Sequence, residues 1–205
     1  MLPELSVLIP TYNRREILRR CLRSLSRQTL APEKYEVIVI DDGSTDRTEE
    51  MLAAFQMDSS LRWQHISHTG PSGARNRGLE MAKGEFVVFV DSDLIVVPEF
   101  LASHLEAHRA KPQSKLVVHG PVIHTTNLDN PQAKQKLTDY SRAFFATGNA
   151  SIALSELKAA GLFDEEFTEY GWEDLEFGRR LRKRKVTAAR EPKAIGYHYK
   201  QQVQL

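Results

Sequence analysis

Short apolar runs alternate along the chain with stretches in which apolar residues recur at a helical spacing. The runs at 5–10, 35–41 and 85–91 are rich in Val, Ile and Leu, which is typical of strands buried on both faces. Residues 14–28, between the first two runs, place apolar side chains three and four positions apart and are predicted to form a helix. This alternation predicts an α/β fold with helices on both faces of a central, mostly parallel mixed sheet.

The rest of the chain continues this alternation less regularly. Further strands are expected near 62–66, at 116–119, over 142–154 and at 194–199. Further helices are expected from about 46, from the end of the loop 67–73 to 83, near 98–110, at 155–160 and in the latter part of 163–185. Residues 119–142 look insertion-like and irregular. No internal repeat or low-complexity tract interrupts the chain, so we expect a single domain over residues 1–205.

Polar clusters follow three of the predicted strands at the point where each strand ends. They read "PTYNR" after the first strand, "DDGSTD" after the second and "DSD" within the apolar run 86–97. In open α/β sheets, ligands bind beyond the carboxyl ends of the strands. Acidic residues there suit a cation or the hydroxyl groups of a sugar or ribose, whereas a bare phosphate favours a glycine-rich turn. No Walker loop or G-x-G-x-x-G motif is present, so phosphate binding here is expected to need a metal ion.

Composition narrows the class of protein. The 28 basic and 27 acidic residues leave a net charge of +1, so no overall field favours nucleic acid as a partner. The single cysteine, Cys21, excludes an internal disulfide and a zinc site built from cysteines. The longest apolar runs fall far short of the ~20 residues that a membrane-spanning helix needs, and no signal peptide precedes the first strand. We therefore expect a soluble, cytoplasmic protein.

Asp91 and Asp93 are the most unusual residues of the apolar run 86–97. In an extended chain, residues two apart point to the same side, and two close carboxylates raise each other's pKa unless a positive charge neutralises them. A hard divalent cation, Mg²⁺ or Mn²⁺, is held in this way by one or two carboxylates together with substrate phosphate. The alternative is a structural role, in which either aspartate caps the following helix or binds loop amides.

The glycine-containing loop 67–73 precedes a second candidate group. Arg75 and Arg77 are expected near the start of the following helix, whose N-terminus carries a positive partial charge. An anion at the strand ends would meet these charges, and Arg75 is the better candidate. The alternative is that both arginines are solvated helix charges.

Five motifs in order, "VLIPTYNR", "VIVIDDGSTD", "GARNRG", "FVDSD" and "GWEDLEFGRRLR", make the chain resemble the family-2 inverting glycosyltransferases of the GT-A fold. The resemblance runs from about residue 5 to 185. It implies a Rossmann-like GT-A domain with a nucleotide-binding half at about 1–97 and an acceptor-side half at about 98–205. It also implies transfer of a sugar from a nucleotide-sugar donor, most simply a UDP-sugar, to a glycan or lipid-linked acceptor.

The resemblance also implies roles for donor-side residues. Pro10, Tyr12 and Asp42 match positions that line the nucleoside pocket, with Asp42 accepting from the base and Tyr12 stacking on it or merely packing. Asp93 matches the direct metal ligand of the family, and Asp91 matches a ligand of ribose or metal. His198 matches a third metal ligand of some GT-A enzymes and would favour Mn²⁺ over Mg²⁺, although a lone histidine in a strand is often structural.

On the acceptor side, the resemblance points to Glu173 and Asp174. One of the two, more often the aspartate, is the general base that takes the proton of the acceptor hydroxyl, and a single displacement then inverts the anomeric carbon. The alternative is that both only begin a helix, where carboxylates are favoured. Trp172 offers an apolar face to an acceptor sugar or belongs to the core. Asn149 bonds a sugar hydroxyl or holds its own turn.

The sequence leaves open two alternative functions and the role of one basic segment. A sugar nucleotidyltransferase would need a glycine-rich basic loop where this chain has "PTYNRRE", and a noncatalytic nucleotide-sugar or glycan-binding module would bind without turnover. Residues 179–185 hold six basic side chains in seven positions, which form either a solvated face or a peripheral contact with anionic lipid at the inner face of the membrane. The sequence leaves the donor sugar, the acceptor and the oligomeric state open.

Overall fold

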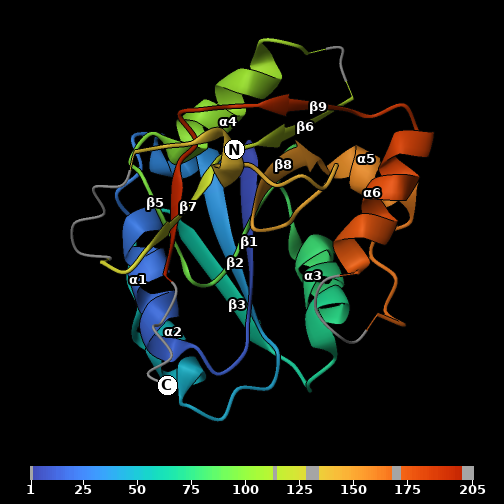
Figure 1. Ribbon diagram of the computed structural model, residues 1–205. Coiled ribbons are helices and arrows are strands. Elements are labelled where there is room, and N and C mark those ends of the chain that lie inside the picture. Colours follow the sequence, from blue (N-terminus) through green and yellow to red (C-terminus); the bar gives the residue numbers. More distant parts are fainter. Residues whose placement is uncertain (1, 113–114, 128–133, 168–171, 200–205) are drawn as a thin grey trace.

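The computed structural model describes residues 2–112, 115–127, 134–167 and 172–199. A seven-stranded sheet has the order β3-β2-β1-β4-β8-β6-β9, and a three-stranded sheet has the order β5-β10-β7 (Figure 1). The strands are β1 (Leu5–Thr11), β2 (Tyr35–Asp41), β3 (Ser60–His65), β4 (Phe86–Val90), β5 (Leu94–Val96), β6 (Leu116–His119), β7 (Val122–Thr125), β8 (Asn149–Ala153), β9 (Thr187–Arg190) and β10 (Gly196–Tyr199). The helices are α1 (Arg15–Leu25), η1 (Pro32–Lys34), α2 (Thr48–Ala54), α3 (Gly70–Met81), α4 (Phe100–Arg109), η2 (Leu137–Asp139), α5 (Leu154–Ala160) and α6 (Glu173–Lys183).

The first four strands of the large sheet are parallel, and β8 runs against β4 and β6. Thr11 pairs with Asp41, and Leu8 pairs with Phe89. The carboxyl ends of β1, β2 and β4 therefore lie side by side at one edge of the sheet. The α/β fold with a mostly parallel mixed sheet is confirmed, and the polar cluster that follows each of these strands comes to one place.

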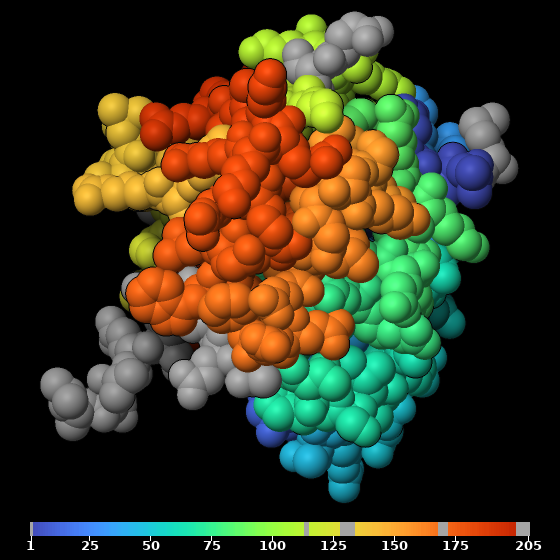
Figure 2. Space-filling view, turned by 90° about the vertical axis from the view of Figure 1, so that its right-hand side faces the viewer, coloured from blue at the N-terminus to red at the C-terminus, as the bar shows by residue number. Residues whose placement is uncertain are grey.

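Helices cover both faces of the large sheet (Figure 1). On one face, apolar side chains of α1, α2 and α4 pack against alternate residues of β1, β2 and β4. On the other face, α5, α6 and Leu79 of α3 pack against Leu8, Val87 and Phe89. Figure 2 shows this second layer from outside, with α6 beside α5 and the green α3 below them. Since both faces are covered, the central strands are mostly apolar, as the sequence predicted, and the buried Ser6 and Glu36 are hydrogen-bonded to each other.

The apolar run at 86–97 is divided between the two sheets. Residues 86–90 form β4 of the large sheet, and residues 94–96 form β5, which pairs with β10 of the small sheet. The intervening residues 91–93 leave one sheet for the other, so their carboxylates stand at the junction. The aspartates thus interrupt the apolar run at the point where the chain passes from the large sheet to the small sheet.

Several element boundaries differ from those predicted. The strand expected over 142–154 begins only at Asn149, because Phe145 packs into the core and Thr147 bonds to α6. α3 begins at Gly70, inside the expected loop. β9 and β7 were not predicted, and β7 lies in the segment expected to be irregular, of which residues 128–133 lie outside the described part. Local sequence did not reveal these elements because long-range contacts define them.

The start of α3 shows how such a boundary arises. Gly70 has a φ of 82°, a conformation that glycine adopts without strain. The backbone N–H groups of Thr69 and Gly70 donate to the Asp42 carboxylate at 2.7 and 3.0 Å. Asp42 therefore satisfies amides at this helix terminus from another strand, in the way a local capping residue would.

In the described part of the chain, no helix has the length and apolar character needed to cross a bilayer.

Candidate active site

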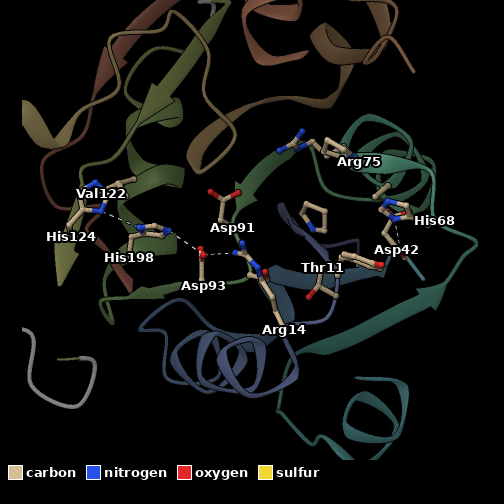
Figure 3. A pocket seen from close by; sticks show the side chains of 15 residues that line it. Thr11, Arg14, Asp42, His68, Arg75, Asp91, Asp93, Val122, His124 and His198 are labelled. Carbon is tan, nitrogen blue, oxygen red and sulfur yellow. Dashed lines mark hydrogen bonds and ion pairs between the residues drawn. The ribbon is translucent and has the colours of Figure 1, made fainter. Parts of the chain in front are cut away.

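A pocket of about 600 Å³ opens at the carboxyl ends of β1, β2 and β4. Figure 3 shows side chains from these ends and from β7 and β10 pointing into it. The lining residues are Pro10, Thr11, Tyr12, Arg14, Asp42, His68, Pro71, Ala74, Arg75, Asp91, Ser92, Asp93, Val122, His124 and His198. The predicted donor and metal residues Pro10, Tyr12, Asp42, Arg75, Asp91, Asp93 and His198 are all among them.

Asp93 lies at the junction of the two sheets and is held from both sides. Its Oδ2 accepts a hydrogen bond from Arg14 Nη1 at 2.5 Å and lies 3.2 Å from His198 Nε2. His198 Nδ1 in turn lies 3.1 Å from His124 Nδ1. The predicted partners Asp93 and His198 are therefore in contact (Figure 3), through a chain of polar groups that also contains Arg14 and His124.

Asp91 and Asp93 differ in their electrostatics although they are only two residues apart. Burial raises the pKa of Asp91 to about 6; the charge of Arg75 opposes this rise, and the charges of Asp93 and Asp174 add to it. Burial also acts on Asp93, but its hydrogen bond with His198 and the charges of His198 and Arg14 hold its pKa below the usual value. The pocket therefore concentrates negative charge that a cation would stabilise.

The structure tests whether these residues suit a divalent cation. In the described residues, no group of three or more His, Cys, Asp or Glu side chains is arranged to hold a metal. However, Asp93 Oδ1 and Asp174 Oδ1 are buried and accept no hydrogen bond, which is costly for a carboxylate unless another group binds it. Open carboxylate oxygens are the ligands that Mg²⁺ and Mn²⁺ prefer. The donor set fits a hard divalent cation, although its members are not gathered into a closed cluster.

Asp42 is more heavily engaged than the sequence suggested. Besides the two backbone amides of residues 69 and 70, it accepts from Thr69 Oγ1 at 3.1 Å, and its Oδ2 lies 2.9 Å from His68 Nδ1. His68 also stacks on Tyr12, with ring centroids 4.5 Å apart. Asp42, His68 and Tyr12 thus form one wall of the pocket, and His68 is a member that the sequence analysis missed.

Arg75 and Glu173 form a fully buried ion pair. Arg75 Nη1 donates to Glu173 Oε1 at 2.8 Å, and each side chain is only 1% exposed. Burial by itself would lower the pKa of Arg75, but the charges of Asp174 and Asp91 raise it above its usual value. Arg75 does line the pocket, yet it lies in the second turn of α3 and faces carboxylates. The contact joins α3 to α6 and engages the Glu173 carboxylate inside the protein.

Asp174 is the second residue of α6 and acts through its charge on Asp91 of the pocket, although it does not itself line the pocket. Thr147 donates to its Oδ2 through the backbone N–H at 2.9 Å and through Oγ1 at 3.1 Å, while its Oδ1 is buried and accepts no hydrogen bond. Burial raises the pKa of Asp174 against the opposing charge of Arg75. A carboxylate with one oxygen held and the other without a hydrogen bond is suited to accept a proton.

The two predicted acceptor-side residues have different surroundings. Trp172 is 68% exposed at the start of α6, so it does not belong to the core. Asn149 is buried; its Nδ2 donates to the backbone oxygens of Pro121 and Ala194, and its Oδ1 lies 3.0 Å from His104 Nε2. Every polar atom of the Asn149 side chain is thus used inside the protein, through contacts with distant residues and not within its own turn.

The basic segment 179–185 is only partly free for a partner. Arg180 bonds to Glu176, Arg184 bonds to Glu156, and Arg182 stacks over the Phe144 ring. Arg179, Lys183 and Lys185 are exposed. About half of the segment therefore holds α6 in place.

Comparison with known proteins identifies the family of the chain. The sequence profile of glycosyl transferase family 2 matches residues 6–161. Validoxylamine A glucosyltransferase of Streptomyces hygroscopicus subsp. limoneus is 31% identical, over 87% of this chain and 48% of the relative. Chondroitin synthase of Escherichia coli is also 31% identical, over 95% of this chain and 34% of the relative. The chain thus spans about half the length, or less, of these curated relatives.

Solved structures show the same architecture. The structure of S. aureus TarS 1-349 in complex with UDP-GlcNAc has a TM-score of 0.78 and 26% identity, and the match covers 98% of this chain and 60% of that one. The mannosyltransferase PcManGT from Pyrobaculum calidifontis, in complex with GDP-Man and Mn2+, has a TM-score of 0.75 at 22% identity and covers 100% of this chain and 59% of that one, so it supports the fold alone. Because the family profile matches most of its residues, this chain belongs to glycosyl transferase family 2.

Proposed function

We propose that this chain carries the catalytic site of an inverting glycosyltransferase that uses a UDP-sugar as donor and a glycan or lipid-linked acceptor. One observation carries the proposal: in a family-2 chain, the buried carboxylates Asp91 and Asp93 line one pocket at the sheet edge, and the charges of Asp93 and Asp174 both act on Asp91. That edge is where α/β sheets bind nucleotides.

The wall formed by Tyr12, His68 and Asp42 suits a nucleobase. Tyr12 offers a ring face, and Pro10 lines the pocket beside it. Both oxygens of Asp42 already accept backbone amides, so little acceptor capacity is left for guanine, which presents two adjacent donors. Uracil presents only one N–H group. If His68 Nδ1 gives up its contact with Asp42 Oδ2, that oxygen can accept from the uracil N–H. The number of acceptor positions on Asp42 therefore favours a uridine donor.

The diphosphate of the donor would lie toward Asp91 and Asp93. Asp93, Asp91 and His198 are the residues that would hold Mg²⁺ or Mn²⁺, which when bound neutralises the charge developing on the leaving diphosphate. Asp93 Oδ1 is the best placed oxygen because it is buried and accepts no hydrogen bond. A stable diphosphate leaving group needs no general acid, so one carboxylate base is enough.

Asp174 is the base in this proposal. Its Oδ1, which accepts no hydrogen bond within the protein, takes the proton of the acceptor hydroxyl as the acceptor oxygen bonds to the anomeric carbon. The bond from that carbon to the diphosphate breaks on the opposite side, which inverts the configuration. Thr147 fixes the other oxygen of Asp174, and the exposed ring of Trp172 offers a stacking surface to an acceptor sugar.

Substitution of the base tests the reaction. We expect Asp174→Asn to lower the rate of sugar transfer by at least about 10²-fold, because asparagine cannot take the proton, while the affinity for UDP changes little. Glu176→Gln, on the same helix, is the matched control. The assay is UDP release with quantified glycosylated product, and transfer at the wild-type rate in Asp174→Asn would exclude this base.

Substitution of the metal residue tests the donor site separately. We expect Asp93→Ala to remove the Mn²⁺-dependent part of UDP binding, measured by calorimetry with and without Mn²⁺. Donor binding without UDP release or product in the wild type, across a panel of acceptors, would indicate the noncatalytic binding module instead.

A further inference from the structure

Arg14 contacts the carboxylate that is best placed to hold a cation. It is the last residue of the "PTYNR" segment and directly precedes α1, whereas Asp93 lies 79 positions later. Arg14 Nη1 donates to Asp93 Oδ2 at 2.5 Å. Figure 3 shows the Arg14 side chain rising from the α1 side of the pocket toward Asp93, with His198 on the opposite side of the same oxygen.

The two partners differ in exposure. The Arg14 side chain is 52% exposed and the Asp93 side chain only 13%. Asp93 is fixed by the sheet junction, whereas the arginine has a long flexible stem with its head at the pocket opening. The guanidinium can therefore move while the carboxylate stays in place.

A guanidinium on Asp93 Oδ2 and a divalent cation on Oδ1 would share one carboxylate, and their charges would repel each other across it. Binding of a metal at Oδ1 would therefore weaken the contact of Arg14 with Oδ2, and a metal held by both oxygens would displace Arg14. A displaced guanidinium at the same wall of the pocket would lie where a donor diphosphate approaches, and its planar fork binds phosphate oxygens well.

We propose that Arg14 is a resident counter-cation of the donor pocket, which competes with the divalent metal for Asp93 and transfers its charge to the donor diphosphate when the metal binds. This inference rests on the proposed function and adds a residue to it. It makes metal binding and diphosphate binding depend on each other through one movable side chain. Arg14 is then a donor-binding residue as well as a positioning residue for Asp93.

The proposal predicts two effects of opposite sign for Arg14→Gln. Without nucleotide, Mn²⁺ should bind about three- to tenfold more tightly, because the competing charge is gone and the ion pair that must be broken is partly exposed. At saturating Mn²⁺, UDP should bind about tenfold more weakly, because a charge-assisted bond to phosphate is lost. An ion pair with a purely structural role would alter stability and leave both affinities unchanged.

The experiment is calorimetric titration of the full chain with Mn²⁺ alone and then with UDP at saturating Mn²⁺. Arg19→Gln is the matched control, because Arg19 is a half-exposed arginine of α1 that pairs with Glu16, and it should behave as wild type. Asp93→Asn reports whether the metal binds at Asp93 at all.

Each outcome decides between the hypotheses. If Asp93→Asn loses Mn²⁺ binding but Arg14→Gln binds Mn²⁺ and UDP like the wild type, the role of Arg14 is overturned and the proposed function stands. If Asp93→Asn binds Mn²⁺ unchanged, the metal site of the proposed function is itself wrong. If Mn²⁺ does not bind without nucleotide, the UDP titration decides, and unchanged UDP affinity in Arg14→Gln overturns the proposal.

Discussion

The buried pair of Arg75 and Glu173 shows how single residues connect distant parts of the site. It joins α3 to α6 and sets the charge that Asp91 and Asp174 meet. A buried pair gains little over a well-packed apolar pair, but removing only one partner leaves a charge buried without its counter-ion. Removal of either partner is therefore expected to destabilise the folded protein, even if the pair takes no part in the reaction.

Glu173→Gln is expected to lower the free energy of unfolding by about 3 kcal/mol, at the low end for a broken buried pair because Asp91 and Asp174 still attract Arg75. The measurement is urea denaturation. Glu80→Gln is the control. It breaks the exposed Arg77–Glu80 pair on α3, the helix that carries Arg75, and should lower the free energy of unfolding by less than about 1 kcal/mol. Equal losses in the two variants would contradict the role given to burial.

At the scale of elements, α4 is attached to β8 by a buried polar network. His108 Nε2 and His104 Nδ1 both lie 2.8 Å from Ser151 Oγ, and His104 Nε2 lies 3.0 Å from Asn149 Oδ1. An amide oxygen only accepts, so His104 carries its proton on Nε2 and accepts from Ser151 at Nδ1. Ser151 is then free to accept from His108. The network needs a neutral His104, because a protonated Nδ1 could no longer accept from Ser151. His108 can donate from Nε2 in either protonation state, but its burial opposes the charged form.

Acid should therefore weaken the attachment of α4. Burial lowers the pKa of His104 to about 3 and that of His108 to about 4, whereas unfolded histidines ionise near 6.5. Between these values the unfolded chain binds more protons, so the free energy of unfolding falls as the pH is lowered below ~6.5. The slope reaches about 1.4 kcal/mol per pH unit for each histidine.

The measurement is urea denaturation at several pH values from about 7 to 5, in wild type and in His108→Gln. The variant should show a shallower loss of stability toward acid. His65 is the control, because its hydrogen bond to Asp41 raises its pKa, so His65 favours the folded state at low pH. His65→Gln should not flatten the acid slope, and an unchanged slope in His108→Gln would contradict the network.

At the scale of the whole molecule, the pocket lies where both sheets and residues from each half of the chain meet. A ligand that binds there only in the folded state stabilises the entire domain. UDP with Mn²⁺ at about 100 times its dissociation constant should add about 2.7 kcal/mol, which raises the melting temperature by about 5–10 °C for a chain of this size. Asp93→Ala should lose the Mn²⁺-dependent part of this shift, and a full shift in that variant would contradict the site.

Contact with a membrane surface is a separate property of the molecule and remains a prediction, as does the cytoplasmic location. Arg179, Lys183 and Lys185 are exposed basic side chains of 179–185, as is Arg182, which stacks over Phe144; each basic side chain is worth about 1 kcal/mol near an anionic surface. Lys183→Gln with Lys185→Gln should then lower binding to phosphatidylserine vesicles at least about tenfold. Vesicle sedimentation at low salt measures this, with neutral vesicles as the control, and equal binding to both would reject the contact.

Sequence by itself determined the layers of the fold and the position of the site. Residues on β1, β2 and β4 repeat apolar side chains because both faces of their sheet are covered, and this pattern is local. The clusters around Tyr12, Asp42 and Asp91 follow directly after those strands, so parallel pairing brings them together. Fold and pocket could therefore be predicted from local periodicity and order along the chain.

Only the tertiary structure decided which of these side chains are engaged and with what. Glu173 is paired with a residue 98 positions away, Asp93 with one 79 positions away, and Asn149 with His104 45 positions away. No local period encodes such contacts, because they depend on how whole helices dock on the sheet. The same docking pairs Glu173 with Arg75 and leaves one oxygen of Asp174 without a hydrogen bond, although the two are neighbours in sequence.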